Sequence, residues 1–279
     1  MRLEERFDSV EYMPNSNNAG VALSLDDKVA LITGGSRGIG RATVRLFRKA
    51  GAKVTFSYRT AVEQAESLVT ECGDPELCRA IQQTLFTPED GQALVNAAVT
   101  AFGRLDCVVV NHGIWPAHDQ PIATMTNNQW RDTLATNLDS VFGVVRAAVA
   151  QMQSQPAAAK TKGHIVLVSS TAGQRGEAFH ADYSASKGAL ISLTKSLSSE
   201  LISQGIHINC VAPGWVATEM SVDVLGNPET SKKLLSQIPL GRPAHVDEIA
   251  APILFLCTPL AGFISGEIFN INGGAVLVG

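Results

Sequence analysis

The sequence contains no long block of basic residues, and its formal net charge is −4, from 22 Lys and Arg against 26 Asp and Glu. Binding to a nucleic-acid polyanion needs a concentrated positive surface, so we expect no nucleic-acid partner. No apolar run approaches the roughly 18 residues that a membrane span requires, so membrane insertion is not expected either. The N-terminus carries charges where a signal peptide has a hydrophobic stretch, which favours a cytoplasmic location.

Cysteine is scarce, and its five positions are scattered along the chain: Cys72, Cys78, Cys107, Cys210 and Cys257. Their number is odd, and no two of them form a C-x-x-C pair. A disulfide framework and a zinc site are therefore not expected, and we predict no metal ligands.

The 279 residues are 45% hydrophobic, which is enough to bury a substantial core. From Lys28 onward, short β-branched apolar runs alternate with longer segments of helical period. Strands are expected at Val29–Thr33, Lys53–Ser57, Ala80–Leu85, Leu105–Asn111, Ile165–Ser169, Ile206–Val211 and Ile268–Ile271. Helices are expected at Gly40–Ala50, Ala61–Cys72, Pro88–Phe102, Asn127–Gln153, Tyr183–Gln204 and Val246–Leu256. This alternation predicts an α/β single-domain Rossmann fold, with a doubly wound seven-stranded parallel sheet and helices on both faces.

Residues 1–24 are polar and rich in turn-forming residues, so they are predicted to form an N-terminal extension. Leu3, Phe7 and Val10 have helical spacing, which leaves open a short helix that rests on the domain or on a neighbouring chain. Residues 25–279 show no repeat and no shift in composition, and we interpret them as one dinucleotide-binding domain.

A glycine-rich segment, TGGSRGIG at residues 33–40, follows the first expected strand and opens the first expected helix. In this context Gly34 permits a tight turn, Gly38 allows close approach of a pyrophosphate, and Gly40 allows close helix packing. The free N–H groups of the helix N-terminus attract the anion. An ordinary glycine-rich connection is the alternative. The predicted dinucleotide contacts in this segment are Gly34, Ser36, Arg37, Gly38, Ile39 and Gly40.

The end of the second expected strand, Ser57-Tyr58-Arg59-Thr60, has no acidic residue. An acid there would bind the ribose 2′-hydroxyl of NAD and would repel the 2′-phosphate of NADP. Arg37 and Arg59 can both pair with that phosphate, so NADP(H) is the predicted cofactor, with Tyr58 and Arg59 among its contacts. If both arginines are only solvated surface charges, this preference has no basis.

Tyr183 and Lys187 are four residues apart at the start of a long helical pattern, so they share one face of the helix. A nearby ammonium lowers the pKa of a tyrosine phenol toward neutrality, where the phenol works as a general acid or base. Ser170, just beyond the fifth expected strand, is placed to donate a hydrogen bond to a carbonyl oxygen. By themselves, the Tyr–Lys pair also fits an amphipathic surface and Ser170 also fits a turn cap.

Taken together and in this order, the motifs resemble those of the short-chain dehydrogenase/reductase family. They are TGGSRGIG at 33–40, Asn111-His112-Gly113, Asn137, Ser170, Tyr183-x-x-x-Lys187 and Pro213-Gly214. The similarity extends from about Asp26 to Gly274, and within the family the chain most resembles NADPH-dependent 3-oxoacyl-carrier-protein reductases. The resemblance implies a small-molecule carbonyl or secondary alcohol as substrate, and a homotetramer.

The resemblance also implies a role for each matching residue. Tyr183 would donate a proton to the substrate oxygen, Lys187 would bind the nicotinamide ribose, and Ser170 would polarise the carbonyl. Asn137 would hold a water that connects Lys187 to solvent. The cofactor contacts that it implies are Asn111, Gly113, Tyr183, Lys187, Pro213, Gly214, Val216 and Thr218.

Three positions depart from the family's pattern. His112 stands where many members have alanine, and we interpret it as a histidine hydrogen-bonded to the backbone rather than as a reacting group. Thr84 falls where the third strand usually ends with an aspartate near the adenine. Asn272 replaces the acid of a late Asp-Gly-Gly motif, with no predicted effect on the chemistry.

Substrate specificity is expected to lie in the loops at residues 173–182 and 217–242. The second loop is interpreted either as a lid that closes over substrate or as a helix pair packed on the domain. Trp115 and His180 either line the pocket or fill space. The predicted function is an NADP(H)-dependent carbonyl reductase, reversible as an alcohol dehydrogenase. The alternatives are an NAD-preferring sugar or sterol dehydrogenase and a non-catalytic dinucleotide-sensing regulator, and the intact Ser–Tyr–Lys set argues against the regulator.

Overall fold

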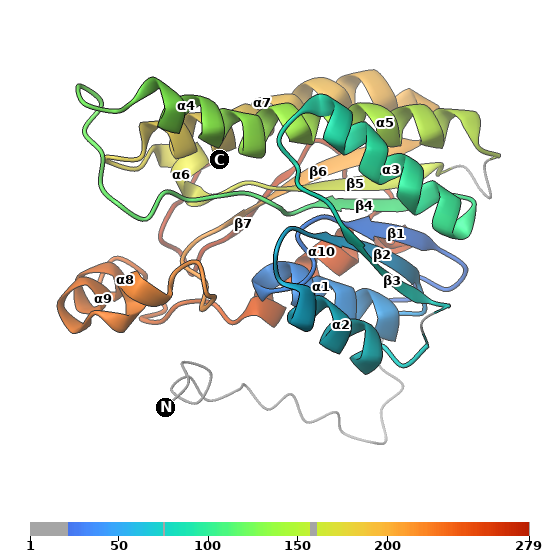
Figure 1. Ribbon diagram of the computed structural model, residues 1–279, viewed down its shortest axis with the longest axis horizontal. Helices are drawn as coiled ribbons and strands as arrows, with labels where there is room; N and C mark the ends of the chain where they lie inside the picture. Colours follow the sequence, from blue (N-terminus) through green and yellow to red (C-terminus); the bar gives the residue numbers. More distant parts are fainter. Residues whose placement is uncertain (1–21, 75, 157–160, 279) are drawn as a thin grey trace.

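The computed structural model describes residues 22–74, 76–156 and 161–278, which form three layers with helices on both sides of one sheet (Figure 1). Residues 1–21 lie outside the described residues, and with them most of the predicted extension 1–24 and the helix predicted around Leu3, Phe7 and Val10. In the described ranges, no helix is both long enough and apolar enough to cross a membrane.

The strands are β1 (Val29–Ile32), β2 (Lys53–Tyr58), β3 (Cys78–Gln82), β4 (Cys107–Val110), β5 (Gly163–Val168), β6 (Ile206–Pro213) and β7 (Ile268–Ile271). All are parallel, in the order β3-β2-β1-β4-β5-β6-β7. This confirms the predicted doubly wound Rossmann sheet. Because the chain crosses from β3 to the far side of β1, a crevice forms at the carboxyl ends of β1 and β4, where ligands bind in such sheets.

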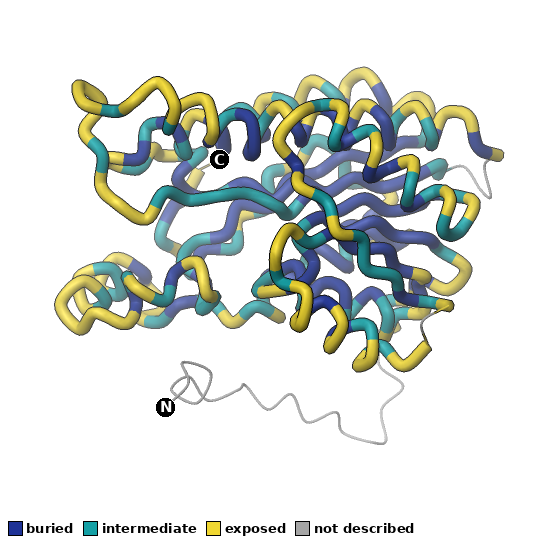
Figure 2. The backbone as a smooth tube through the Cα atoms, viewed as in Figure 1, coloured by how far each residue is buried: buried dark blue, intermediate teal, exposed yellow. Residues whose placement is uncertain are grey.

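The helices are α1 (Gly38–Lys49), α2 (Val62–Glu71), α3 (Pro88–Phe102), α4 (Asn127–Leu134), α5 (Ser140–Ser154), α6 (Thr171–Arg175), α7 (Ala181–Leu201), α8 (Val222–Gly226), α9 (Pro228–Leu235) and α10 (Val246–Leu256). α1, α2 and α10 cover one face of the sheet, while α3, α5 and α7 cover the other (Figure 1). Figure 2 shows the central strands buried and the outer sides of the helices exposed. Burial of the apolar strand faces against these helices is the main stabilising contribution.

Small residues bring α3 and α5 close together. A Cβ atom on Gly143 would collide with the backbone of Pro88, and one on Gly91 would come within 2.6 Å of the Ser140 carbonyl oxygen. Some of the small residues that the sequence places on this helical segment therefore serve packing within the chain.

Two elements differ from the sequence predictions. β3 covers Cys78–Gln82 instead of Ala80–Leu85, because this edge strand is mostly half-exposed and lacks a clear alternation. The single helix predicted at Asn127–Gln153 is divided into α4, a π-helical turn at Ala135–Asp139, and α5. A π turn adds one residue to a helix without breaking its helical character, so hydrophobic periodicity does not reveal it.

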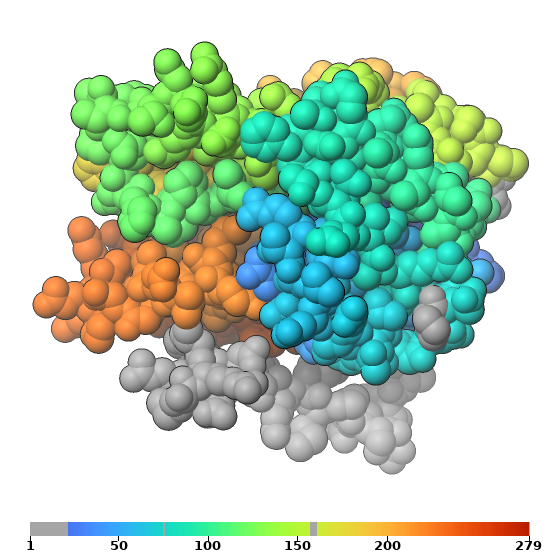
Figure 3. All heavy atoms as spheres, in the orientation of Figure 1, coloured from blue at the N-terminus to red at the C-terminus, as the bar shows by residue number. Residues whose placement is uncertain are grey.

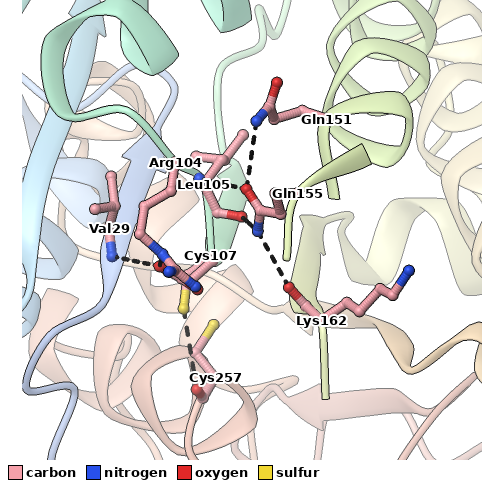
Figure 4. Close-up of polar contacts among 9 residues, drawn as sticks. Val29, Arg104, Leu105, Cys107, Gln151, Gln155, Lys162 and Cys257 are labelled. Atoms are coloured by element: carbon pink, nitrogen blue, oxygen red, sulfur yellow. Dashed lines mark hydrogen bonds and ion pairs between the residues drawn. The ribbon is translucent and has the colours of Figure 1, made fainter. Parts of the chain in front are cut away.

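A polar network lies at the amino ends of the central strands β1 and β4, at the opposite end of these strands from the crevice (Figure 4). The Asp106 carboxylate accepts hydrogen bonds from the Val29 amide, at 2.9 Å, and from the Arg104 guanidinium, at 2.7 and 2.9 Å. The Gln155 side chain bonds both backbone groups of Leu105, at 3.0 and 2.7 Å. These bonds satisfy buried backbone groups and attach the end of α5 to the sheet.

Candidate active site

A cleft of about 490 Å³ lies at the carboxyl ends of the central strands. The segment after β4 and the segment after β6, green and orange in Figure 3, contribute to its walls and lie next to each other in that view. Every site residue predicted from the sequence lines this cleft except Gly40 and Asn137, which lie outside its lining. The cleft is large and polar enough at one end for an extended, charged ligand.

The glycine turn has the geometry that the sequence predicts. Gly34 has φ of 65°, in the left-handed region that favours glycine. A Cβ atom on Gly40 would collide with the Gly34 carbonyl oxygen, so α1 can approach the turn only with glycine at this position. The N-terminus of α1 therefore opens directly onto the cleft, where its free N–H groups can meet an anion.

Asn111 holds the glycine turn in place from the end of β4. Its amide nitrogen Nδ2 donates to the carbonyl oxygens of Thr33, at 3.1 Å, and Gly34, at 3.2 Å. The Gly34 amide in turn donates to the Ser57 hydroxyl at the end of β2, at 3.2 Å. Three neighbouring strand ends therefore position the backbone that would receive a pyrophosphate.

Arg37 and Arg59 both line the cleft and are both exposed. Among the residues that the structure describes, no carboxylate oxygen lies within 4.0 Å of either guanidinium. Tyr58, at the end of β2, lines the same part of the cleft. Both guanidinium groups are therefore free to pair with a phosphate group.

The prediction that Thr84 stands at the end of the third strand is wrong. Gln82, the last residue of β3, pairs with Tyr58, and the chain then turns so that Gln83 and Leu85 line the cleft while Thr84 is exposed outside it. The cause is the earlier end of β3, since a change of strand register moves every following side chain.

Ser170, Tyr183 and Lys187 come together at the other end of the cleft. Ser170 follows β5 and caps α6, where its hydroxyl accepts a hydrogen bond from the Ala172 amide at 3.1 Å. Tyr183 lies in the first turn of α7, and the Ser170 side chain is close enough to the phenol to lower its pKa. The Lys187 ammonium donates to the Val168 carbonyl oxygen at 2.9 Å and lies 5.8 Å from the centre of the Tyr183 ring.

The pKa values of this pair differ from the sequence prediction. Desolvation by burial raises the pKa of the Tyr183 phenol to about 12, against the lowering effect of the nearby Ser170 side chain. Burial lowers the pKa of Lys187 to about 8. The prediction that Lys187 brings the phenol toward neutrality is therefore wrong for these two side chains alone, because desolvation disfavours both charged forms. The phenol is protonated at neutral pH.

Asn137 lies in the π turn and is completely buried. Its Oδ1 accepts from the Ile114 amide at 2.8 Å, and its Nδ2 donates to the Ile114 carbonyl at 2.9 Å and to the Ser186 hydroxyl at 3.1 Å. The side chain therefore joins the loop after β4 to α7, one residue before Lys187. A role in holding a water beside Lys187 stays a prediction.

His112 bonds two side-chain hydroxyls, and it also faces the Thr136 backbone, in agreement with the backbone contact that the sequence interpretation assigned to it. Its Nδ1 lies 2.7 Å from the Thr33 hydroxyl, and its Nε2 lies 2.8 Å from the Ser140 hydroxyl. The Ser140 hydroxyl donates to the Thr136 carbonyl at 2.9 Å, so it accepts from His112, which places the ring proton on Nε2. Burial lowers the pKa of His112 to about 3, and the nearby Lys187 acts in the same direction.

The sequence leaves Trp115 and His180 open either as pocket residues or as space-filling ones. Trp115 lines the cleft, and the His180 ring stacks on it. The lining residues that sequence reasoning missed include Ile114, Arg175, Glu177, Trp215, Glu219 and Met220. Most of them lie in the two loops expected to carry specificity, but no spacing or motif distinguishes an individual loop residue as a ligand contact.

The segment 217–242 forms two short helices, α8 and α9, at one end of the molecule (Figure 1). Leu225 and Ile238 are buried in it, whereas Met220 is 53% exposed at the cleft. The short helices agree with both earlier interpretations, a lid and a packed helix pair. Movement of this segment over a substrate stays a prediction.

The fold and this cleft define an oxidoreductase of the Rossmann class, and comparison with known proteins gives its family. Residues 34–276 match the family model described as enoyl-(acyl carrier protein) reductase. The chain belongs to the short-chain dehydrogenase/reductase family, whose members work with a nicotinamide dinucleotide.

Among curated relatives, the chain is 36% identical to the 3-oxoacyl-[acyl-carrier-protein] reductase FabG of Vibrio cholerae over 256 residues, 92% of this chain and 100% of that protein. It is 34% identical to a 3-oxoacyl-[acyl-carrier-protein] reductase of Synechocystis over 91% of this chain and 99% of that one. These matches confirm the family resemblance drawn from the sequence motifs.

Two solved structures from Brucella melitensis are similar throughout. One is a short-chain dehydrogenase/reductase described as a glucose/ribitol dehydrogenase, with a TM-score of 0.82 and 32% identity over 91% of this chain and 98% of that one. The other is a 3-ketoacyl-(acyl-carrier-protein) reductase in complex with NADH, with a TM-score of 0.82 and 30% identity over 91% of this chain and 100% of that one.

Proposed function

We propose that this protein is an NADP(H)-dependent carbonyl reductase that also acts in reverse as an alcohol dehydrogenase. The observation that carries the proposal is the position of Ser170, Tyr183 and Lys187 at one end of a cleft whose other end is the glycine turn. A dinucleotide that spans the cleft would bring a nicotinamide near the phenol, and the bound cofactor would supply the hydride.

The three side chains then have separate tasks. Tyr183 is the proton donor to the carbonyl oxygen, since its raised pKa of about 12 keeps the phenol protonated at neutral pH. Ser170 lies close to that phenol and can donate to the substrate oxygen as negative charge develops on it. Lys187 would contact the ribose of a bound cofactor and hold positive charge beside the reacting groups, which favours the phenolate left after proton transfer.

The remaining predicted contacts divide between the two ends of the cofactor. Gly34, Ser36, Gly38 and Ile39 would receive the pyrophosphate at the N-terminus of α1. The segment after β6 would hold the nicotinamide carboxamide, through Pro213, Gly214, Val216 and Thr218. Asn111, Gly113 and Tyr58 would border the adenosine side, and Gly40 and Asn137 act from behind the lining by positioning backbone.

The preference for NADP(H) rests on charge. Arg37 and Arg59 have no carboxylate partner among the described residues, and residues 57–60 include no acid. A 2′-phosphate would therefore meet two cations that have no ion-pair partner in the described part of the chain. The Brucella melitensis reductase was crystallised with NADH, so the comparison of both cofactors is an essential part of the test.

The proposed substrate is a small ketone or secondary alcohol. We also propose that the protein is cytoplasmic and that it forms a homotetramer. Phe142 on α5 is 45% exposed and Phe263 is fully exposed, and both are suitable for contact with further copies of the chain. Light scattering of the purified protein would measure the number of subunits. A monomer at micromolar concentration would contradict the assembly without affecting the assigned chemistry.

The experiment that tests the function is a panel of ketones, β-ketoesters and sugars, followed by the loss of NADPH absorbance. We expect reduction of at least one ketone, with a higher kcat/KM for NADPH than for NADH. A protein that binds NADPH tightly but turns over no member of the panel in either direction would support the regulator instead.

A further inference from the structure

One carboxylate lies at the substrate end of the cleft, on the loop between α6 and α7. It belongs to Glu177, whose backbone amide donates to the Ser184 hydroxyl at 2.9 Å, next to Tyr183 in the sequence. This bond fixes the main chain of Glu177 against the first turn of α7. The carboxylate is close enough to Tyr183 for its charge to raise the pKa of the phenol.

The surroundings of Glu177 are built from three loops. The Trp115 side chain lies close enough to the Glu177 carboxyl to lower its pKa, and the Trp115 ring stacks on His180 with ring centres 4.8 Å apart and planes 9° apart. Trp215 approaches Trp115 edge-on at 6.0 Å. The His180 imidazole also contacts the Pro116 carbonyl oxygen through Nε2, at 2.9 Å. The Glu177 main chain is therefore fixed by the Ser184 bond, and its side chain is half-buried at the cleft.

The surroundings of Glu177 raise the pKa of its carboxyl. Burial is the main cause and Asp119 adds to it, while His180, Trp115 and Arg175 oppose the rise. Both ring nitrogens of His180 face carbonyl oxygens, of Ala178 at 3.1 Å and of Pro116 at 2.9 Å, so this ring is engaged by the backbone.

The carboxylate has acceptor capacity left for a ligand. Its two oxygens offer about four lone-pair sites for hydrogen bonds. The indole rings of Trp115 and Trp215 provide apolar surfaces that pack well against carbon–hydrogen faces. A ligand that fits both features has a short carbon chain and a hydroxyl group.

We infer that Glu177 is a substrate-binding residue that selects ketones with a hydroxyl group on the carbon next to the carbonyl, and vicinal diols in the reverse direction. This inference rests on the proposed function, because it needs the carbonyl oxygen at Tyr183 and Ser170. The adjacent hydroxyl then donates to the Glu177 carboxylate. A ketone without that hydroxyl leaves the half-buried carboxylate without a hydrogen-bond donor. Sites that bind a substrate hydroxyl discriminate strongly against such analogues.

The test compares 3-hydroxy-2-butanone with 2-butanone, which differ only in this hydroxyl, with NADPH as the hydride donor. For the unmodified protein we expect kcat/KM to be at least tenfold higher for the hydroxyketone. Glu177→Leu should bring the ratio close to one by lowering the hydroxyketone value alone, and Glu177→Gln, which keeps the shape, should lie between. Glu200→Gln, at the exposed far end of α7, is the matched control and should keep the original ratio.

A binding measurement separates this inference from the proposed function. In the Tyr183→Phe background, calorimetry with NADPH present should show hydroxyketone binding that weakens at least tenfold when Glu177→Leu is added. Equal kcat/KM values for the two ketones, or parallel losses in Glu177→Leu, would overturn the role of Glu177 while leaving the reductase in place. If no ketone is reduced, the proposed function fails. If hydroxyketone binding is unchanged in the double variant, the role of Glu177 fails, whatever the outcome for reduction.

Discussion

The Nε2 nitrogen of His112 lies 2.8 Å from the Ser140 hydroxyl oxygen, so a side chain after β4 is attached to the first turn of α5. The other ring nitrogen meets Thr33 at the end of β1. One imidazole therefore joins the base of the glycine turn to the π turn that carries Asn137. Because both nitrogens have partners that fit the neutral ring, an added proton would have to break one of these bonds.

This relationship predicts acid sensitivity. The pKa of His112 falls from 6.5 to about 3 in the folded protein, and burial also lowers that of His164 to about 4. A lowered pKa means that the fold stabilises the neutral ring, so this stability is complete above pH 6.5 and is lost as the pH falls toward 3. For His112 alone the loss reaches about 5 kcal/mol at most, from about 1.4 kcal/mol per pKa unit.

Urea unfolding at pH 7.5, 6, 5 and 4.5 would measure this loss. His112→Ala should lower the free energy of unfolding at pH 7.5 and flatten its decline below pH 6.5. His118→Ala, which removes an exposed imidazole, is the control and should reproduce the original curve. An equally steep decline in His112→Ala would show that another group causes the acid sensitivity.

Tyr183→Phe should retain NADPH binding and lose nearly all ketone reduction. The phenyl ring keeps the packing, but it has no proton to transfer, and positioned general acids contribute about 10²–10⁴ in rate. Cofactor fluorescence would measure binding, and absorbance would measure turnover. Turnover within tenfold of the original rate would contradict the assignment of Tyr183 as proton donor.

The pH dependence of kcat/KM should distinguish the two directions. Reduction needs a protonated phenol, and the Tyr183 pKa of about 12 supplies it throughout the usual range. Lys187 loses its charge near pH 8 in the free protein, so reduction should decline above that pH. Alcohol oxidation needs the phenolate, so it should increase with pH. A reduction profile that is flat to pH 10 would show that the charge of Lys187 is not required.

Arg59→Asp should weaken NADPH binding at least tenfold, about 1.4 kcal/mol, and leave NADH binding nearly unchanged. The reason is the loss of a charge-assisted contact to the 2′-phosphate and the addition of a like charge beside it. Arg131→Asp, an exposed arginine on α4, is the matched control for net charge. If Arg59→Asp affects both cofactors equally, Arg59 does not read the 2′-phosphate.

Hydrophobic periodicity predicted every strand of the sheet, because the central strands are short runs of buried and largely apolar residues, many of them β-branched. It misplaced β3, whose mostly half-exposed residues give a weak pattern. Motif spacing in turn led to Ser170, Tyr183 and Lys187, since an i, i+4 pair and a strand-end serine are visible without coordinates. Glu177 has no such spacing, because a loop residue acquires its role from what folds against it.

By itself, the sequence determined the fold class, the family, and which residues are the candidates for the cofactor turn and for proton transfer, because these depend on local periodicity and short motifs. Tertiary structure alone decided the protonation of those groups. Desolvation depends on every atom packed around Tyr183, Lys187 and His112, and those atoms come from distant parts of the chain. For the same reason, the surroundings of the Glu177 carboxylate form only when the loop after β4 and the loop between α6 and α7 fold against each other.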